Sequence, residues 1–436
     1  MVPPQVLKLG RVVESLYSFM KRIPDPRSGK RIKHRCEDVL TCLVLGFCAG
    51  RTTIERALGW CTSHAPLLKR HMRLEHGIAS DSTACRLLKG IDPQDFCDVF
   101  LQWVSSLIPI KGACLIVDGK GTRAGAKKIS GERTPYILNV VEATTGICVG
   151  ITAVGPKENE KPAFHRLLDV LDIEGSLLLA DAMATDAIIM EHINGKGGSF
   201  FFQVKKNNPE TYAQLMTQMG ILEQENKAMK EKGKCDPAYR EPMETFSLAK
   251  TVERNRERHE YRFCCTTNDV SLLDRSQTDL PFLKTIGKTT QVRIPIERDN
   301  DGNNVTPSLK DFMNGGSKKK PAPTEGDGME DDISRVGIVS NAVFDSETSM
   351  AAKRLYWTIE NSTHYVLDNI LREDRCTAKK SRENFALIRR IAYNVLRIIQ
   401  IREGHRKDEI GKTSDSFCDY FSYAEKYIFG GIASFI

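Results

Sequence analysis

The chain has 436 residues, of which 41% are hydrophobic and 27% are charged, and its net charge is +7. This length predicts two or three domains with a substantial buried core, and the composition excludes wholesale disorder. The longest apolar stretch, residues 39–50, is too short to span a bilayer, and the first residues lack the apolar run of a signal peptide. We therefore expect a soluble protein with no membrane partner.

The positive charge is concentrated in two stretches. Residues 21–35 hold seven Lys or Arg against one Asp, and residues 351–407 hold thirteen against six acids. Such clusters attract nucleic-acid phosphates, although a solvated surface explains either cluster alone equally well. The 13 cysteines are scattered without a CxxC pair, which indicates reduced thiols rather than a zinc site or a disulfide framework.

Residues 1–108 are expected to form a helical N-terminal module. Apolar residues recur at helical spacing from Leu40 to Phe47. A second amphipathic stretch follows the turn at Asp92-Pro93.

The pattern changes after Gly112, where apolar segments of strand length begin. The segments are, in order, ACLIVDG, YILNVVEATTG, ICVGITAVGPK, AFHRLLDVLDI, SLLLADAM, AIIMEHING and SFFFQVK. They predict the order β-β-β-α-β-α-β, which is that of an RNase H-like sheet, whereas a doubly wound nucleotide-binding sheet would need strict alternation of strand and helix. We therefore predict an α/β fold with an RNase H-like mixed-sheet catalytic core at residues 109–405.

Residues from about 208 to 345 interrupt this pattern. The segments EYRFCCTT and TTQVRIPIE within them predict strands, so a β-rich insertion is expected. Residues 299–332 are polar, rich in Gly and Pro and mixed in charge, which predicts a disordered loop. The helical pattern resumes near Ser346 and extends through residues 383–402, and residues 406–436 are expected to form a C-terminal tail.

Three acidic residues stand out by their place in these elements. Asp118 and Asp181 each close an apolar run predicted as a buried strand, and Glu360 lies on the polar face of a helix. Carboxylates near a low-dielectric interior are costly unless a cation meets them, and a pair of divalent metal ions suits such a set. The three residues thus indicate phosphoryl transfer on nucleic acid. The alternative for the two aspartates is capping of a strand end or a turn.

The helix that carries Glu360 has further polar residues at helical spacing. Trp357, Asn361, His364 and Asp368 are predicted to share one broad face with it. Glu360 could bind a metal shared with the two aspartates, while Asn361 and His364 could orient it or contact phosphate. A zinc site at His364 is disfavoured, because the second His and the general-base Glu of a zinc motif are missing.

Several short motifs occur in a specific order along the chain. They are Asp25-Pro26-Arg27 with His34, DSTACRLL, Asp118-Gly119-Lys120 with Arg123, Lys157-Glu158-Asn159-Glu160, Asp181-Ala182-Met183, Lys205 with Asn207, Arg258 with Glu260 and Arg262, WTIENSTHYVLD with Glu373-Asp374, and Glu383-Asn384. In this order they resemble the DDE transposases of bacterial insertion sequences known as H-repeat-associated proteins. The resemblance covers roughly residues 20–400, and the IEN-x-x-H block around Glu360 is its most specific part.

This resemblance implies a DNA transposase that cleaves strands at the ends of an insertion element and transfers them to target DNA. Asp118, Asp181 and Glu360 match the family's catalytic, metal-binding carboxylates, which imply two Mg²⁺ ions, with Mn²⁺ as a possible substitute. The implied partner is double-stranded DNA, bound by a homodimer in synapsis, in the cytoplasm of a bacterium or the nucleus of a eukaryote. The matching positions expected to contact DNA are Lys120, Arg123, Lys157, Lys205, Asn207, Arg258, Arg262, Asn361 and His364.

Alternatives remain open beside this interpretation. For Arg258 and Arg262 a surface salt bridge is the favoured alternative. The same carboxylates would also serve a nuclease or resolvase that only hydrolyses DNA, and an inactivated or domesticated DNA-binding protein would keep the same fold. The chain departs from the family pattern at Tyr356, where His is common, and at Thr185, where a Gln is expected nearby. Neither departure removes a carboxylate.

Overall fold

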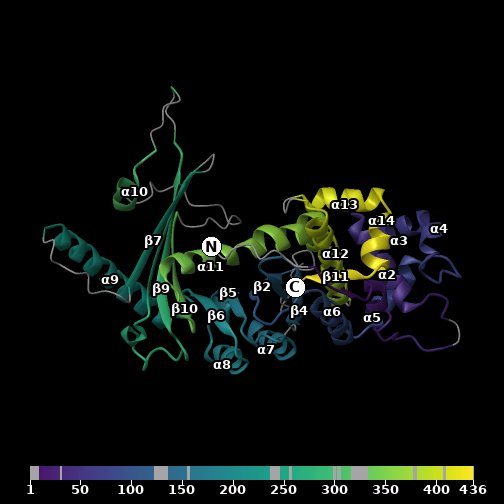
Figure 1. Ribbon diagram of the computed structural model, residues 1–436, viewed down its shortest axis with the longest axis horizontal. Coiled ribbons are helices and arrows are strands. Elements are labelled where there is room, and N and C mark those ends of the chain that lie inside the picture. Colours follow the sequence, from purple (N-terminus) through teal and green to yellow (C-terminus); the bar gives the residue numbers. More distant parts are fainter. Residues whose placement is uncertain are drawn as a thin grey trace, which may run out of the picture. The chain divides into compact units, whose positions relative to one another are not determined.

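The computed structural model describes most of the chain (Figure 1). The described residues are 9–29, 32–121, 136–154, 158–235, 246–254, 258–297, 301, 306–315, 332–376, 381–405 and 409–435. They fall into two compact units. The helix-rich unit comprises residues 2–178, 195–198 and 355–436, and the sheet unit comprises residues 179–194 and 199–354.

An antiparallel meander forms the strand layer of the helix-rich unit. Its strands are β2 (Cys114–Gly121), β3 (Tyr136–Glu142) and β4 (Cys148–Val154). The apolar run from Leu115 to Val117 is buried, because branched side chains pack well on a pleated surface. The turn between β3 and β4 falls at Thr145-Gly146, where Gly146 has a φ of 72° that favours glycine.

The elements that follow β4 confirm the predicted order. They are α7 (Glu160–Val170), β5 (Leu177–Ala180), η2 (Ala182–Ala184), α8 (Ala187–Gly195) and β6 (Ser199–Val204). Apart from the short turn η2, the order from β2 to β6 is β-β-β-α-β-α-β. The fold is therefore mixed α/β, with the element order predicted for an RNase H-like core.

Helices from both ends of the chain pack together in the helix-rich unit. The early elements are β1 (Leu9–Val13), α1 (Leu16–Met20), α2 (Cys36–Cys48), α3 (Ile54–Ser63), α4 (Ala65–Leu68), α5 (Asp81–Gly90) and α6 (Pro93–Leu107). The late elements are α12 (Arg382–Arg402), α13 (Ile410–Asp419), α14 (Ser422–Ala424), η7 (Glu425–Phe429) and β11 (Ile432–Phe435). α12 contacts α2, α6 and α13, and β1 pairs antiparallel with β11 (Figure 1). The N-terminal module and the C-terminal tail predicted from the sequence thus belong to one compact unit.

A glycine sets the closest approach between two of these helices. A Cβ added to Gly46 on α2 would lie 2.3 Å from the Cβ of Ala57 on α3. No side chain fits at that distance, so this helix pair requires glycine at position 46.

Helix α12 is buried on nearly every side. Its apolar side chains from Phe385 to Ile399 are buried, and Arg389, Arg390 and Arg397 are buried as well. A buried guanidinium needs partners, and Arg397 Nε donates to the carbonyl of Thr145 at 2.7 Å. The burial of these arginines was not predicted from the sequence.

Arg390 forms the most deeply buried ion pair of this unit among the described residues. It pairs with Glu373, and the two side chains are 0% and 1% exposed. Its Nε also donates to Oδ1 of Asn139 on β3 at 2.9 Å. The pair therefore connects α12, the short helix η6 (Glu373–Arg375) and the meander.

The sheet unit is built on an antiparallel sheet with the strand order β6-β10-β9-β8-β7. Its further elements are α9 (Pro209–Cys235), β7 (Phe246–Arg254), β8 (Arg258–Thr267), η3 (Val270–Leu272), β9 (Thr285–Pro295), α10 (Leu309–Gly315), β10 (Ile333–Ser340) and α11 (Ser346–Tyr356), of which the last two residues belong to the helix-rich unit. Figure 1 labels β7, β9 and β10 of this sheet, and β8 lies between β7 and β9. Strands β8 and β9 were predicted, whereas α9, β7 and β10 were not.

The segment predicted as a disordered loop, residues 299–332, is described only at 301, 306–315 and 332. Within it, residues 309–315 form helix α10. Among the described helices, none combines the length and the apolar character needed to cross a membrane.

Replacing Arg390 by Leu is expected to lower the free energy of unfolding by about 3–5 kcal/mol, because it leaves the buried Glu373 carboxylate without a partner. The double variant with Glu373→Leu is expected to recover part of this loss. Urea unfolding measures both. The control is Arg375→Leu, at an exposed position of η6, the short helix that carries Glu373. A loss below about 1 kcal/mol for Arg390→Leu would contradict a structural role for the pair.

Candidate active site

Asp118 on β2 contacts two side chains, Tyr356 at the end of α11 and His364 in the helical segment that follows it. The Tyr356 hydroxyl donates to Asp118 Oδ1 at 2.8 Å. His364 Nδ1 lies 3.5 Å from Asp118 Oδ2, and the two side chains are 11% and 15% exposed. Both carboxylate oxygens therefore have a polar neighbour, which fixes the orientation of Asp118.

The segment that carries Glu360 is a π-helix and not the regular α-helix that was predicted. It comprises η4 (Ile359–His364) and η5 (Val366–Ile370), and η4 contacts β2. The wider turn changes which residues share a face. His364 is buried, Glu360 is half-buried and Asn361 is exposed, so the three do not point the same way. π-helical turns are rare and frequently occur at functional sites.

Lys120 lies two residues after Asp118 and is engaged inside the protein. Its side chain is 7% exposed, it pairs with Asp368, and its Nζ is 3.6 Å from Asp374 Oδ1. Burial raises the pKa of Asp368, Lys120 lowers it, and the neighbouring Asp374 raises it. Lys120 thus offsets two carboxylates beside Asp118.

His364 is neutral in this setting. Its pKa is lowered to about 3, chiefly by burial and also by the positive charges of Lys120 and Arg390. Its Nε2 is buried without a hydrogen-bond partner in the structure. Donation to Asp118 requires the proton on Nδ1, which leaves an acceptor lone pair on Nε2.

Gly119, between Asp118 and Lys120, is required by its neighbour on β3. A Cβ at this position would lie 2.0 Å from the ring of Tyr136. One residue before Gly119, Asp118 pairs across the strands with the fully buried Asn139 on β3. Because Asn139 also accepts from Arg390, the backbone beneath Asp118 is tied to the buried ion pair.

Asp181 belongs to the sheet unit, where it ends β5 and caps η2. Its carboxylate accepts from the backbone N–H of Met183 at 2.9 Å. The Asn207 side chain donates to the carbonyl of Ala182 at 2.8 Å, so it lies at the same turn, while Lys205 is exposed. The capping contact considered as the alternative role of Asp181 is therefore present.

The other predicted DNA-contacting residues differ in their surroundings. Arg258 and Arg262 both pair with Glu260, and Arg262 also lies 2.9 Å from Glu253. The salt bridges favoured as the alternative for these two arginines are thus present. Arg123 and Lys157 lie outside the described residues.

The carboxylates of Asp118 and Glu360 provide the kind of oxygen ligand that Mg²⁺ prefers, on two elements in contact. Within the part of the chain that the structure describes, no group of three His, Cys, Asp or Glu side chains could hold a metal ion. The chemistry of the donors fits a divalent ion, whereas the described residues of neither unit assemble a complete ligand set.

Two contributors were not predicted from the sequence. Tyr356 was noted only as a departure from the family pattern, and Arg390 only as part of a basic stretch. Their contacts with Asp118 and Asn139 join residues 238 and 251 positions apart in the chain, which no local pattern indicates.

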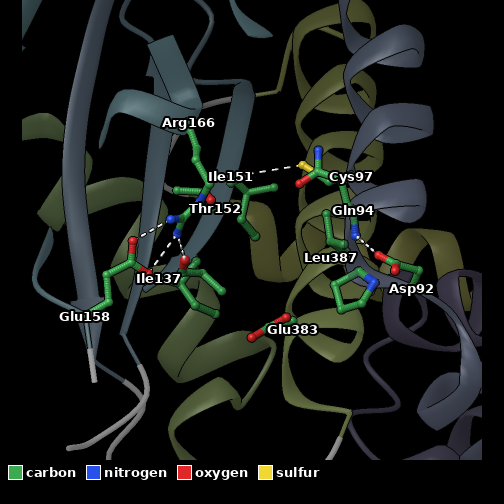
Figure 2. A pocket seen from close by; sticks show the side chains of 12 residues that line it. Asp92, Gln94, Cys97, Ile137, Ile151, Thr152, Glu158, Arg166, Glu383 and Leu387 are labelled. Atoms are coloured by element: carbon green, nitrogen blue, oxygen red, sulfur yellow. Dashed lines mark hydrogen bonds and ion pairs between the residues drawn. The ribbon is translucent and has the colours of Figure 1, made fainter. Parts of the chain in front are cut away.

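A pocket of about 300 Å³ lies elsewhere in the helix-rich unit (Figure 2). Figure 2 shows Arg166 extending from α7 to the Glu158 carboxylate, and its Nη2 donates to the carbonyl of Ala153 at 2.8 Å. Glu383 at the start of α12, Leu387 on the same helix and Ile137 on β3 also line this pocket. Burial raises the pKa of Glu383, Arg166 lowers it, and Asp92 raises it.

Two family models match this chain. The transposase DDE domain matches residues 109–395, and the domain described as DDE_Tnp_1-associated matches residues 17–104. The chain therefore belongs to the DDE-domain transposase family. The matched ranges meet where the pocket lies, since Asp92 to Cys97 come from the first range and its other lining residues from the second.

Similar proteins carry related names. The chain is 24% identical over 389 residues to the "H repeat-associated putative transposase YhhI" of Escherichia coli K12, which covers 88% of this chain and 90% of that protein. It is 24% identical to the "Putative transposase YncI" of Escherichia coli O157:H7 over 418 residues, 93% of each chain. A structure of the piggyBac transposase synaptic complex with hairpin DNA covers 95% of this chain and 76% of that chain at 9% identity, with a TM-score of 0.41. At that score the two chains share too little for the fold to be carried over.

Replacing Glu383 by Gln is expected to raise stability at neutral pH. A carboxyl whose pKa is raised on folding stabilises the protein below its ordinary value of 4.5 and loses this contribution as the pH rises through the folded value. The gain from Glu383→Gln should therefore disappear below pH 4.5. Urea unfolding midpoints at neutral pH and below pH 4.5 measure this gain in stability, and the exposed Glu55→Gln is the control. An equal gain at both pH values would contradict this origin.

Proposed function

We propose that this protein is a DNA transposase that cleaves strands at the ends of an insertion element and transfers them to target DNA. The observation that carries the proposal is the arrangement around Asp118. Tyr356 and His364 orient its carboxylate, and Glu360 lies on η4, which contacts the strand of Asp118. Membership of the DDE-domain transposase family supports the same reaction class.

Asp118, Asp181 and Glu360 are proposed as the catalytic carboxylates and as the ligands of two Mg²⁺ ions, which Mn²⁺ could replace. When bound, such ions supply activation of a water or a DNA 3′-hydroxyl and stabilise the departing oxygen. The carboxylates of Asp118 and Glu360 come from the helix-rich unit and that of Asp181 from the sheet unit.

The neighbouring residues have positioning roles in this proposal. Tyr356 donates to one oxygen of Asp118 and thereby orients the carboxylate. Neutral His364 adds no positive charge beside the carboxylate. Lys120 offsets the negative charges of Asp368 and Asp374, so these two carboxylates compete less with Asp118 for a bound cation.

Double-stranded DNA is the proposed partner, as terminal repeat and as target. Exposed Lys205, Asn207 and Asn361 are available for phosphate contacts. Lys120 and His364 are buried and are proposed to act through Asp118 instead. Synapsis of two element ends would need a homodimer, and the proposed location is the cytoplasm of a bacterium or the nucleus of a eukaryote.

The three acids provide the direct test. Asp118→Asn, Asp181→Asn and Glu360→Gln are each expected to reduce cleavage of element-end DNA with Mg²⁺ or Mn²⁺ by about 10³-fold or more, with unfolding midpoints close to that of the parent. Glu347→Gln, at an exposed position of α11, is the control. Full cleavage by any of the three variants would remove that residue from the site.

A labelled element end with a free 3′-hydroxyl separates transposition from hydrolysis. A transposase joins this end to a target duplex, whereas a nuclease or resolvase only shortens it. Tight binding with neither product would establish a DNA-binding protein without activity.

The role of Tyr356 predicts an effect on metal affinity. Tyr356→Phe is expected to weaken Mn²⁺ binding about 10- to 100-fold, because second-shell hydrogen bonds orient the ligand carboxylate. Titration followed by electron paramagnetic resonance measures binding without DNA or turnover. The control is Tyr365→Phe, at an exposed position between η4 and η5, which should leave Mn²⁺ binding unchanged. Equal or tighter binding by Tyr356→Phe would show that its hydroxyl does not assist the ligand.

A further inference from the structure

Helix α12 supplies polar side chains to two neighbouring structures at once. Asn394 Nδ2 donates to the carbonyl of Cys148 on β4 at 2.8 Å, and Asn394 Oδ1 accepts from the backbone N–H of Cys148 at 2.9 Å. Arg389 Nε donates at 3.1 Å to the carbonyl of Leu371, the residue that follows η5. One helix therefore bonds both the meander of β2, β3 and β4 and the π-helical segment.

Tyr393 of the same helix joins these two structures directly. Its hydroxyl donates to the carbonyl of Gly146, in the turn between β3 and β4, at 2.7 Å. The same hydroxyl lies 3.0 Å from the hydroxyl of Thr363 on η4. Because the single proton of the tyrosine hydroxyl is given to Gly146, the Thr363 hydroxyl is the donor in the second bond. Thr363, Tyr393 and Gly146 thus form a chain of two hydrogen bonds from η4 to the meander.

This hydrogen-bonded chain lies inside the protein. Thr363 and Tyr393 are 0% and 1% exposed. A hydroxyl removed from water needs a partner, and each of these two hydroxyls has one. A hydrogen bond is stronger where the local dielectric constant is low and water does not compete. The chain therefore holds η4 against α12 more firmly than a hydrogen bond at the surface would.

The buried side of η4 is held while Glu360 stays partly accessible. Ile359 and Thr363 are fully buried, whereas Glu360 between them is half-buried. η4 also contacts β2, the strand that carries Asp118. π-helical turns are rare and occur mostly as single turns, so we expect such a segment to depend on contacts outside itself.

We propose that Thr363 and Tyr393 are positioning residues for Glu360, which set the place of its carboxylate relative to that of Asp118. The inference rests on the proposed function and adds to the site two buried residues that act through η4. Tyr393 bonds the turn of the meander, and β2 of the same meander carries Asp118, so the chain of bonds places both carboxylates in one frame. A displacement of about 1 Å at a catalytic group can cost about 10²-fold in rate.

Thr363→Val tests the chain, because valine keeps the shape of threonine and lacks its hydroxyl. In the full chain with Mg²⁺ and element-end DNA, kcat for cleavage is expected to fall about 10- to 100-fold, while KM for the DNA changes by less than about threefold. Tyr393→Phe should show a loss of similar size. The double variant should lose about as much as Tyr393→Phe alone, since that change already breaks the bond to Thr363.

Thr363→Ser tests whether the hydroxyl carries the effect. Serine keeps the hydroxyl and lacks the methyl group, so cleavage should stay within about threefold of the parent. A serine variant that cleaves as poorly as Thr363→Val would overturn the proposal, because the packing of the side chain and not its hydrogen bond would then be responsible.

Thr413→Val is the matched control. Thr413 on α13 lies in the same unit and is likewise 0% exposed, and its hydroxyl donates to the carbonyl of Glu409 at 3.3 Å. This variant should lose a similar amount of stability in urea and yet cleave like the parent. Equal losses of cleavage for Thr413→Val and Thr363→Val would overturn the proposal, because they would reflect general destabilisation.

Mn²⁺ binding without DNA, followed by electron paramagnetic resonance, separates this inference from the proposed function. Thr363→Val is expected to weaken Mn²⁺ binding about tenfold, and Thr413→Val should leave it unchanged. This pair of results, with a parent that does not cleave, would overturn the proposed function and leave the positioning role standing.

Parent-like cleavage and Mn²⁺ binding by Thr363→Val would overturn the positioning role alone. A parent that neither binds Mn²⁺ nor cleaves would overturn both. If Thr363→Val does not fold, Tyr393→Phe replaces it, with the same expected loss and the same contradicting result.

Discussion

The buried pair of Arg390 and Glu373 is the interaction on which the candidate site depends. A charge pair almost without solvent exposure tolerates little displacement, because loss of either partner leaves a charge in a low-dielectric interior. Arg390 also bonds Asn139, the cross-strand partner of Asp118. The pair therefore fixes the strand beneath Asp118 relative to the helix α12, and the carboxylate has a rigid base.

Local patterns predicted most elements of the core, since an apolar run bounded by turn residues is sufficient to define β2, β3 or β4. They also singled out Asp118, because a carboxylate at the end of a buried run is costly, and Glu360, because it shares a helix with further polar residues. They did not predict α9, β7 or β10, whose mixed composition gives weak periodicity. The π-helical turn at Glu360 also escaped prediction, because its wider hydrogen-bonding pattern depends on packing against β2.

Long-range contacts set the remaining features. Tyr356 and Lys120 are ordinary residues in sequence, and their partners Asp118 and Asp368 lie far along the chain. Both contacts join β2 to helical segments that lie far from it along the chain.

The pairing of β1 with β11 has a consequence for the order in which the protein assembles during synthesis. The helix-rich unit takes its strands and helices from residues 2–178 and 355–436, with the sheet unit's residues between them. A chain emerging from the ribosome presents the sheet unit complete while the early helices still lack α12 and β11. Residues 2–178 therefore remain only partly covered until residues 355–436 have been synthesised, and chaperones can bind them during this time.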